Sequence, residues 1–306
     1  MQNKNFSVYA QGCIYPEDGN YDPAKKAIGV LKSSGFKTAI LGLFHIGRNF
    51  DISPSQNLGD IYFNNTLVIS EGEYVGDSNW PALVQSMLDG SVTTLCASIG
   101  GGYPVMDYQT IKRIYLDNGN SFNNTNLMDN FTCMRETFPG ISIIDMDCEE
   151  TYNQESFVAF CQMLGSLGFD ITFCPYNTQG FWINSLQQLN TSNPGLVKWW
   201  NLQCYDGGEG NDPAIWASAI QQQIPGFSTD GFILPGDWTD DSPSEVKQLM
   251  STFKNDSSVG GGFIWTLDLI IDSSYSATDY VKAISTGLAN ESVNSFNLST
   301  AELALE

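Results

Sequence analysis

Positively charged residues are scarce in this 306-residue chain, which has 13 lysines and arginines against 34 acidic residues and a formal net charge of −21. Such a charge repels polyanions, so we expect no nucleic-acid partner and no binding to an anionic membrane. Long apolar runs are missing too, because none approaches the ~20 residues that span a bilayer. Residues 1–6 lack the apolar segment of a signal peptide, and we expect none within this chain.

Histidine occurs once, as His45, and no two of the seven cysteines have CxxC spacing. These absences argue against a zinc site, and we expect no metal or other cofactor. Several cysteines fall in or beside predicted strands, which favours small buried thiols. The seven are Cys13, Cys96, Cys133, Cys148, Cys161, Cys174 and Cys204.

The remaining composition is polar but weakly charged. Only 15% of residues are charged, whereas 12% are aromatic and Asn, Ser, Thr and Gly are plentiful. This composition suits a neutral, hydroxyl-rich ligand such as a saccharide.

Strand-like and helix-like segments alternate along the chain. The segments predicted as strands are 6–10, 37–44, 93–99, 141–147, 169–173, 197–205, 231–234 and 262–267. Those predicted as helices are 22–35, 81–89, 108–116, 127–137, 154–167, 181–189, 213–223, 243–253 and 277–288. Strand cores that are apolar on both faces indicate parallel strands covered by helices.

Eight strand–helix units in a chain of this length predict an α/β fold, a (β/α)8 TIM barrel. A doubly wound open sheet is the alternative, but no glycine-rich phosphate loop follows the first strand. We expect a single barrel over residues 1–289, with a hairpin insertion at about 50–77 that turns on Asn64-Asn65. This hairpin either forms one wall of a cleft or covers the barrel rim. The polar tail 290–306 should lie outside the barrel.

Three carboxylates follow one another at the end of the fourth predicted strand. Asp145, Asp147 and Glu149 alternate along an extended segment, so their side chains should share one face, while Glu150 is predicted to be a solvated or structural charge. At ~6 Å and an effective dielectric of ~20, two carboxylates repel by roughly 3 kcal/mol, or about two pKa units. Such a row either keeps one carboxyl group protonated near neutral pH or binds a cation. We favour the first, because no nearby loop offers the oxygen cage that Mg²⁺ or Ca²⁺ requires.

The pattern Asp145-x-Asp147-x-Glu149 resembles the DxxDxDxE signature of family 18 glycoside hydrolases, which are chitinases and endo-β-N-acetylglucosaminidases built on this barrel. Three other strand ends, and Tyr9 on the first strand, are similar to further motifs of that family. These segments are Ser98-Ile99-Gly100-Gly101, similar to SxGG, Gln203-Cys204-Tyr205-Asp206, similar to Q/M-x-Y-D/N, and Gly261-Gly262-Phe263-Ile264-Trp265, similar to a glycine-led strand ending in tryptophan. Together the motifs span most of the barrel.

The chain departs from the signature at three positions. Ser142 and Ile143 stand where the family has its first aspartate and a glycine, and Cys148 replaces the usual tryptophan before the glutamate. Position 142 is out of phase with the carboxylates, so it should face the helices and affect packing more than chemistry.

The resemblance implies a substrate-assisted retaining mechanism, an exception to two-carboxylate hydrolysis. Glu149 would be the general acid and base, and the N-acetyl oxygen of the −1 sugar would be the nucleophile. Asp147 would hydrogen-bond the acetamido N–H and share a proton with Asp145. Tyr205 would hold the acetamido carbonyl, and Trp265 would form the floor of the −1 subsite.

Further residues are expected to bind the substrate, whereas His45 has no catalytic duty in this chemistry. The substrate-binding candidates are Gln203, Asp206, Tyr9, Ser98, Gly100 and Tyr176, with Tyr103, Trp182 and Trp238 as additional candidates for flanking subsites.

The sequence therefore predicts a glycoside hydrolase that cleaves β-1,4-linked N-acetylglucosamine in chitin or chitooligosaccharides. The alternatives are an endo-β-N-acetylglucosaminidase acting on N-glycan cores and an inactive chitin-binding lectin of the same fold. A passive barrel in a transport or adhesion component is a third class. We expect a monomer that is extracellular or secreted, because the substrate is normally outside the cell.

Overall fold

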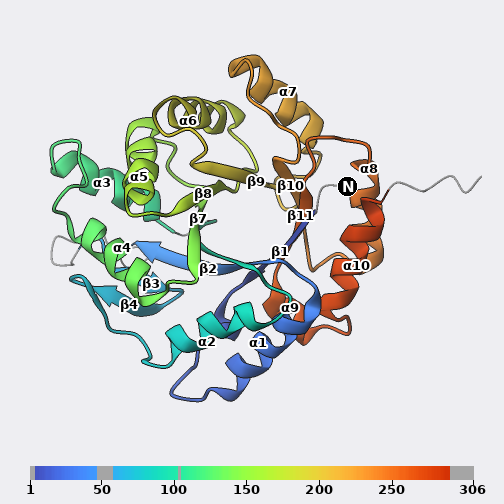
Figure 1. Ribbon diagram of the computed structural model, residues 1–306, viewed down its shortest axis with the longest axis horizontal. Coiled ribbons are helices and arrows are strands. Elements are labelled where there is room, and N and C mark those ends of the chain that lie inside the picture. Colours follow the sequence, from blue (N-terminus) through green and yellow to red (C-terminus); the bar gives the residue numbers. More distant parts are fainter. Residues whose placement is uncertain (1–3, 47–57, 103–104, 290–306) are drawn as a thin grey trace, which may run out of the picture.

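The computed structural model describes residues 4–46, 58–102 and 105–289, and within them eight parallel strands close into a barrel (Figure 1). The barrel strands are β1 (Asn5–Ala10), β2 (Thr38–Ile46), β6 (Thr94–Gly101), β7 (Ile141–Cys148), β8 (Asp170–Phe173), β9 (Val197–Gln203), β10 (Ile233–Trp238) and β11 (Gly261–Trp265). Each pairs with the next, and β1 pairs with both β2 and β11, which closes the ring. The predicted (β/α)8 TIM barrel is confirmed.

Helices surround the ring of strands (Figure 1). They are α1 (Asp22–Ser34), α2 (Trp80–Ser86), α3 (Asp107–Asp117), α4 (Asn126–Thr137), α5 (Gln154–Ser166), α6 (Gln179–Ser192), α7 (Pro213–Gln223), α8 (Pro243–Thr252), α9 (Leu267–Asp272) and α10 (Ala277–Gly287), with 3-10 turns η1 (Gly12–Ile14) and η2 (Met87–Asp89). Gly35 ends α1 with a φ of 94°, and Ser242 and Ser276 start α8 and α10 with capping boxes. Within the described ranges, every helix is too short or too polar to cross a bilayer.

The predicted hairpin is part of a three-stranded antiparallel extension that pairs beside the C-terminal end of β2. Its strands are β3 (Ile61–Phe63), β4 (Thr66–Ser70) and the short β5 (Glu73–Tyr74). Asn64 adopts a φ of 50° at the predicted turn, and β3 pairs antiparallel with β2. Phe63 packs against Phe44 with ring centroids 5.0 Å apart, so the hairpin covers apolar surface at the barrel rim. Residues 50–57 of the predicted insertion and the tail 290–306 lie outside the described residues.

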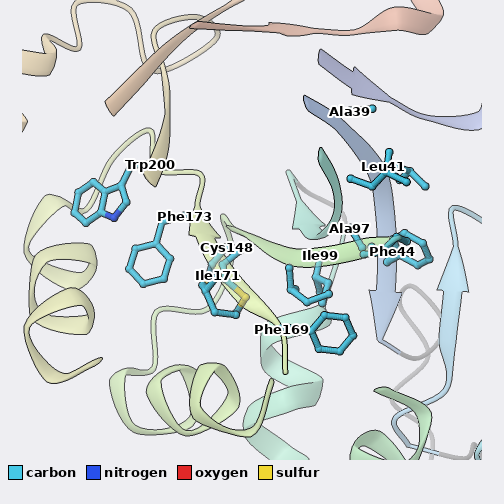
Figure 2. Close-up of a cluster of buried hydrophobic side chains, with 14 of the residues drawn as sticks. Ala39, Leu41, Phe44, Ala97, Ile99, Cys148, Phe169, Ile171, Phe173 and Trp200 are labelled. Atoms are coloured by element: carbon cyan, nitrogen blue, oxygen red, sulfur yellow. The ribbon is translucent and has the colours of Figure 1, made fainter. Parts of the chain in front are cut away.

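Two apolar cores lie on opposite faces of the barrel strands. The outer core faces the helices, and Figure 2 shows it running from Leu41 on β2 through Ile99 on β6 to Phe173 on β8. The inner core fills the barrel and consists of Tyr9, Ile40, Cys96, Ile143, Cys174, Tyr205, Leu234 and Phe263. Ile143 belongs to the inner core, whereas Ile141 belongs to the outer core, because the register of β7 with β6 shifts between these two residues. Ser142 lies at this shift and is half-buried, so its orientation toward the helices stays a prediction. Cys148, at the family's tryptophan position, also belongs to the outer core.

The end of β10 differs from the prediction. The sequence pattern ends this strand at residue 234, whereas β10 continues through Pro235 and Gly236 to Trp238. Proline and glycine are uncommon inside strands, but a Cβ at position 236 would lie 2.0 Å from the Phe263 ring. Glycine is therefore needed here so that Phe263 can fill the barrel interior. The short helix α9 was also not predicted, because it follows β11 directly.

Candidate active site

A cavity of about 340 Å³ opens at the C-terminal ends of the barrel strands. Every barrel strand, or the residue just after it, contributes to the cavity. The lining residues are Tyr9, Leu43, Gly101, Gly102, Asp147, Glu149, Cys174, Gln203, Tyr205, Asp206, Trp238, Thr239, Asp240, Trp265 and Leu269. The structure thus brings together the predicted residues Tyr9, Asp147, Glu149, Gln203, Tyr205, Asp206, Trp238 and Trp265.

Asp145 lies beneath this cavity and is fully buried. Its Oδ2 accepts hydrogen bonds from Tyr9 Oη and Ser98 Oγ, each at 2.8 Å. Its Oδ1 accepts from Thr172 Oγ1 at 2.6 Å and from Asn201 Nδ2 at 2.9 Å. Burial raises the pKa of Asp145, and the donors Thr172, Ser98, Tyr9 and Asn201 each act to lower it. Four neutral donors therefore hold this carboxyl group in one position.

Asp147 lies one step higher on the same face of β7 and is 3% exposed. Burial, followed by repulsion from Glu149 and Asp145, raises the pKa of Asp147 well above its usual value. The proton sharing between Asp145 and Asp147 stays a prediction.

Gln203 connects the two upper carboxyl groups. Its Nε2 donates to Glu149 Oε1 at 2.9 Å and lies 3.3 Å from Asp147 Oδ1. Asn201 and Gln203 are two residues apart on β9 and point to the same face. This strand therefore supplies one amide donor to Asp145 and another to Asp147 and Glu149. The amide groups thus fix the orientation of the row without adding charge.

Aromatic rings form the remaining walls. Tyr9 packs against Trp265 with ring centroids 5.2 Å apart, and Tyr205 stacks on Trp238 at 5.9 Å with an interplanar angle of 21°. Burial raises the pKa of Tyr205 well above its usual value, so its hydroxyl group stays protonated and can donate. The cavity therefore combines acidic groups with flat apolar surfaces.

The glycine segment after Ser98 makes room for the carboxylates. Gly100 has a φ of 118°, and a Cβ there would lie 2.0 Å from the carbonyl oxygen of Asp147. Gly101 has a φ of 110°, and a Cβ there would lie 2.6 Å from Leu43 Cδ1. Ser98 and Gly100 do not line the cavity. Ser98 supports Asp145 beneath it, and Gly100 allows close packing against the Asp147 backbone beside it.

Two predicted aromatic candidates lie away from the cavity. Trp182 was predicted as a subsite residue, and this is wrong: it is 1% exposed in the outer core, with its ring 5.3 Å from Phe173 and 5.6 Å from Phe157. Tyr176 is half-buried and does not line the cavity, although its backbone oxygen accepts a hydrogen bond from Asn211. Tyr103 lies outside the described residues.

Some functional residues were not predicted from the sequence. Thr172 and Asn201 support Asp145, and Thr239, Asp240 and Leu269 line the cavity. Asn201 has a detectable signal, because it stands two residues before Gln203 in the same strand. A polar residue inside an otherwise apolar strand is the corresponding signal for Thr172.

Two other titratable side chains near the barrel rim, His45 and Glu150, have structural partners. His45 Nδ1 lies 2.9 Å from Asp107 Oδ2, and the other oxygen of Asp107 accepts from Ile46 N at 2.6 Å. Glu150 Oε1 accepts from Tyr108 N at 2.5 Å at the start of α3, as expected for a structural charge. Neither His45 nor Glu150 lines the cavity.

All seven cysteines belong to the described residues, and each is a free thiol. Burial raises the pKa of Cys174, the one that lines the cavity, well above its usual value. Across the part of the chain that the structure describes, no three His, Cys, Asp or Glu side chains are placed to hold a metal ion.

No protein-family model and no curated protein sequence matches the chain, but solved structures match its fold. The catalytic domain of a family GH18 chitinase from the fern Peteris ryukyuensis aligns with a TM-score of 0.56 and 16% identity, over 94% of this chain and 100% of that one. Active domain 2 of a thermostable chitinase from Pyrococcus furiosus, solved as catalytic-site mutants with chito-oligosaccharides, aligns with a TM-score of 0.58 and 12% identity, over 94% of this chain and 95% of that one. The β-mannanase from the blue mussel Mytilus edulis aligns with a TM-score of 0.56 and 9% identity, over 94% of this chain and 92% of that one. These similarities show a shared TIM-barrel fold.

Proposed function

We propose that this chain is a glycoside hydrolase of the family 18 type that cleaves β-1,4-linked N-acetylglucosamine in chitin or chitooligosaccharides. The proposal depends mainly on one observation: Asp147 near the end of β7 and Glu149 just after it line a cavity that also presents Tyr205 and Trp265. Two chitinases among the solved structures of this fold support it.

In this proposal Glu149 protonates the glycosidic oxygen. Burial, followed by repulsion from Glu149 and Asp145, raises the pKa of Asp147, which favours keeping one proton on the carboxylate row. Gln203 Nε2, 2.9 Å from Glu149 Oε1, fixes the acid's orientation. After the leaving group departs, Glu149 acts as the base that activates water.

The substrate's own acetamido group is the nucleophile. Its oxygen attacks the anomeric carbon of the −1 sugar and forms an oxazolinium ion, so no enzyme carboxylate bonds to the sugar. Asp147 accepts a hydrogen bond from the acetamido N–H and compensates the developing positive charge. Tyr205 donates to the acetamido oxygen, and the Trp265 ring packs under the apolar face of the pyranose.

Turnover of soluble chitooligosaccharides by the native chain and by Glu149→Gln tests this function. We expect Glu149→Gln to lower kcat by about a thousandfold, because a general acid contributes 10²–10⁴ in rate. The matched control is Glu150→Gln, which removes the same charge one residue away and keeps an oxygen acceptor for Tyr108 N. Unchanged cleavage by Glu149→Gln would refute the assignment of the acid.

The two alternatives give different results in the same experiment. Binding without cleavage by the native chain would indicate a chitin-binding lectin. Release of an intact glycan from a high-mannose glycoprotein, in preference to cleavage of chitin, would indicate an endo-β-N-acetylglucosaminidase.

A further inference from the structure

Cys174 lines the cavity, and the proposed chemistry gives its thiol no role. The residue directly follows β8 and is 2% exposed, inside the inner core. Its backbone N–H donates to the Met146 carbonyl oxygen on β7 at 3.0 Å. On the other side, Gln203 N donates to the carbonyl oxygen of Pro175, the next residue, at 2.9 Å. Backbone hydrogen bonds therefore fix this segment between β7, which carries the carboxylate row, and β9.

The sulfur atom of Cys174 has two polar neighbours. Tyr9 Oη lies 3.1 Å from it, and Gln203 Nε2 lies 3.5 Å from it. A phenol carries a single hydrogen, and that of Tyr9 is directed to Asp145 Oδ2, the acceptor at 2.8 Å. The contact with Tyr9 therefore uses the hydrogen of the thiol, which is present because burial raises the pKa of Cys174 well above its usual value. The lone pairs of the sulfur are then free to accept from Gln203.

The side-chain amide of Gln203 carries two hydrogens, and its acceptors lie on two sides. One hydrogen is directed to Glu149 Oε1 at 2.9 Å. The other faces Asp147 Oδ1 at 3.3 Å, the Cys174 carbonyl oxygen at 3.4 Å and Cys174 Sγ at 3.5 Å. Because both hydrogens belong to one planar amide group, contacts made by the second decide where the first points.

We propose that Cys174 is a positioning residue whose thiol holds the Gln203 amide on Glu149. This inference rests on the proposed function, because it names a support of the proposed acid. Gln203 donates to the thiol, the thiol to Tyr9, and Tyr9 to Asp145, so that each hydrogen bond polarises the next. The acid is thereby joined to the buried base of the carboxylate row through neutral groups. Loss of the thiol should disturb the orientation of the acid more than the affinity for the sugar.

Hydrolysis of the N-acetylglucosamine tetramer by Cys174→Ala and Cys174→Ser tests this role. We expect Cys174→Ala to lower kcat about tenfold and to change KM by less than about twofold. Cys174→Ser keeps one donor and one acceptor near the position of the sulfur, and its kcat should stay within about threefold of the native value. The matched control is Cys96→Ala, the same substitution at a fully buried position of the inner core. Its kcat should stay within about twofold of the native value.

A second background shows whether Cys174 acts through Gln203. Gln203→Leu removes the amide, so adding Cys174→Ala to it should lower kcat by less than about twofold, whereas the same change lowers kcat about tenfold in the native chain. Equal losses in the two backgrounds would overturn the inference. An unchanged kcat in Cys174→Ala, or the same loss in Cys96→Ala as in Cys174→Ala, would overturn it as well.

Hydrogen exchange of the Gln203 side-chain amide, followed by NMR after isotope labelling of glutamine, gives a readout that needs no sugar. The signal is assigned by its absence in Gln203→Leu. Exchange should be about tenfold faster in Cys174→Ala than in the native chain, and Cys96→Ala should match the native chain. Equal exchange in Cys174→Ala and the native chain contradicts the inference. If the native chain does not cleave the tetramer, the proposed function fails, and amide exchange alone decides the role of Cys174.

Discussion

Tyr9→Phe tests whether Asp145 is held as a buried carboxylate. The substitution removes one O–H donor, 2.8 Å from Asp145 Oδ2, and keeps a ring that packs 5.2 Å from Trp265 and 5.4 Å from Phe263. A hydrogen bond to a charged group contributes about 1.5–3 kcal/mol. We therefore expect the free energy of unfolding to fall by about 2 kcal/mol when Asp145 is ionised.

The loss of unfolding free energy caused by Tyr9→Phe should increase with pH. Burial raises the pKa of Asp145 in the folded state, and Tyr9 is one of the donors that limit the rise. At acid pH, where both folded proteins hold Asp145 protonated, the phenol donor matters little. The loss should grow as pH rises through the folded-state pKa of Asp145, because only the ionised form needs the donor.

Urea unfolding from about pH 4 to pH 8 measures this dependence. The control is Tyr74→Phe, which removes an O–H that donates to the backbone carbonyl of Asp77 at 2.7 Å. A bond to this neutral acceptor should contribute about 1 kcal/mol at every pH. If the loss of unfolding free energy in Tyr9→Phe is also constant with pH, Tyr9 does not stabilise an ionised Asp145.

Three other substitutions test separate parts of the structure. Asp237→Asn removes a carboxyl group; burial raises the pKa of this group from 3.8 to about 7. The free energy of unfolding of the native chain should therefore fall from about pH 4 to pH 7. Above pH 7, urea unfolding should show the variant more stable than the native chain by up to about 4 kcal/mol. Trp182→Ala empties a site in the outer core and should lower the free energy of unfolding by about 3–5 kcal/mol in the same assay. Gly100→Ala places a Cβ 2.0 Å from the Asp147 carbonyl oxygen, and the shift of β7 should lower kcat by about a hundredfold in oligosaccharide hydrolysis.

The carboxylate row could be predicted from the sequence because its geometry is local. Asp145 and Asp147 alternate along one strand, and the period of two alone places them on one face. The same rule fails at Ser142, because the register of β7 with β6 shifts between Ile141 and Ile143 and puts these two residues in different cores.

Which residues donate to Asp145 could not be predicted, because this depends on pairing between strands. Thr172 lies beside Asp145 only through the register of β7 with β8. Nothing in a single threonine indicates which strand will neighbour it. Trp182 shows the opposite error: a tryptophan suggests sugar stacking, but its phase on α6 directs it into the outer core.

The four donors of Asp145 also bear on how the barrel assembles. They come from β1, β6, β8 and β9, at sequence separations of 136, 47, 27 and 56 residues. A charge buried with too few partners is costly, so Asp145 is fully satisfied only when distant parts of the chain are together. A fragment lacking β1, or one ending before β9, leaves a donor position empty at the centre of the fold. Barrel closure should accordingly be cooperative, and a chain divided between β6 and β7 should form a native barrel only when both pieces are present.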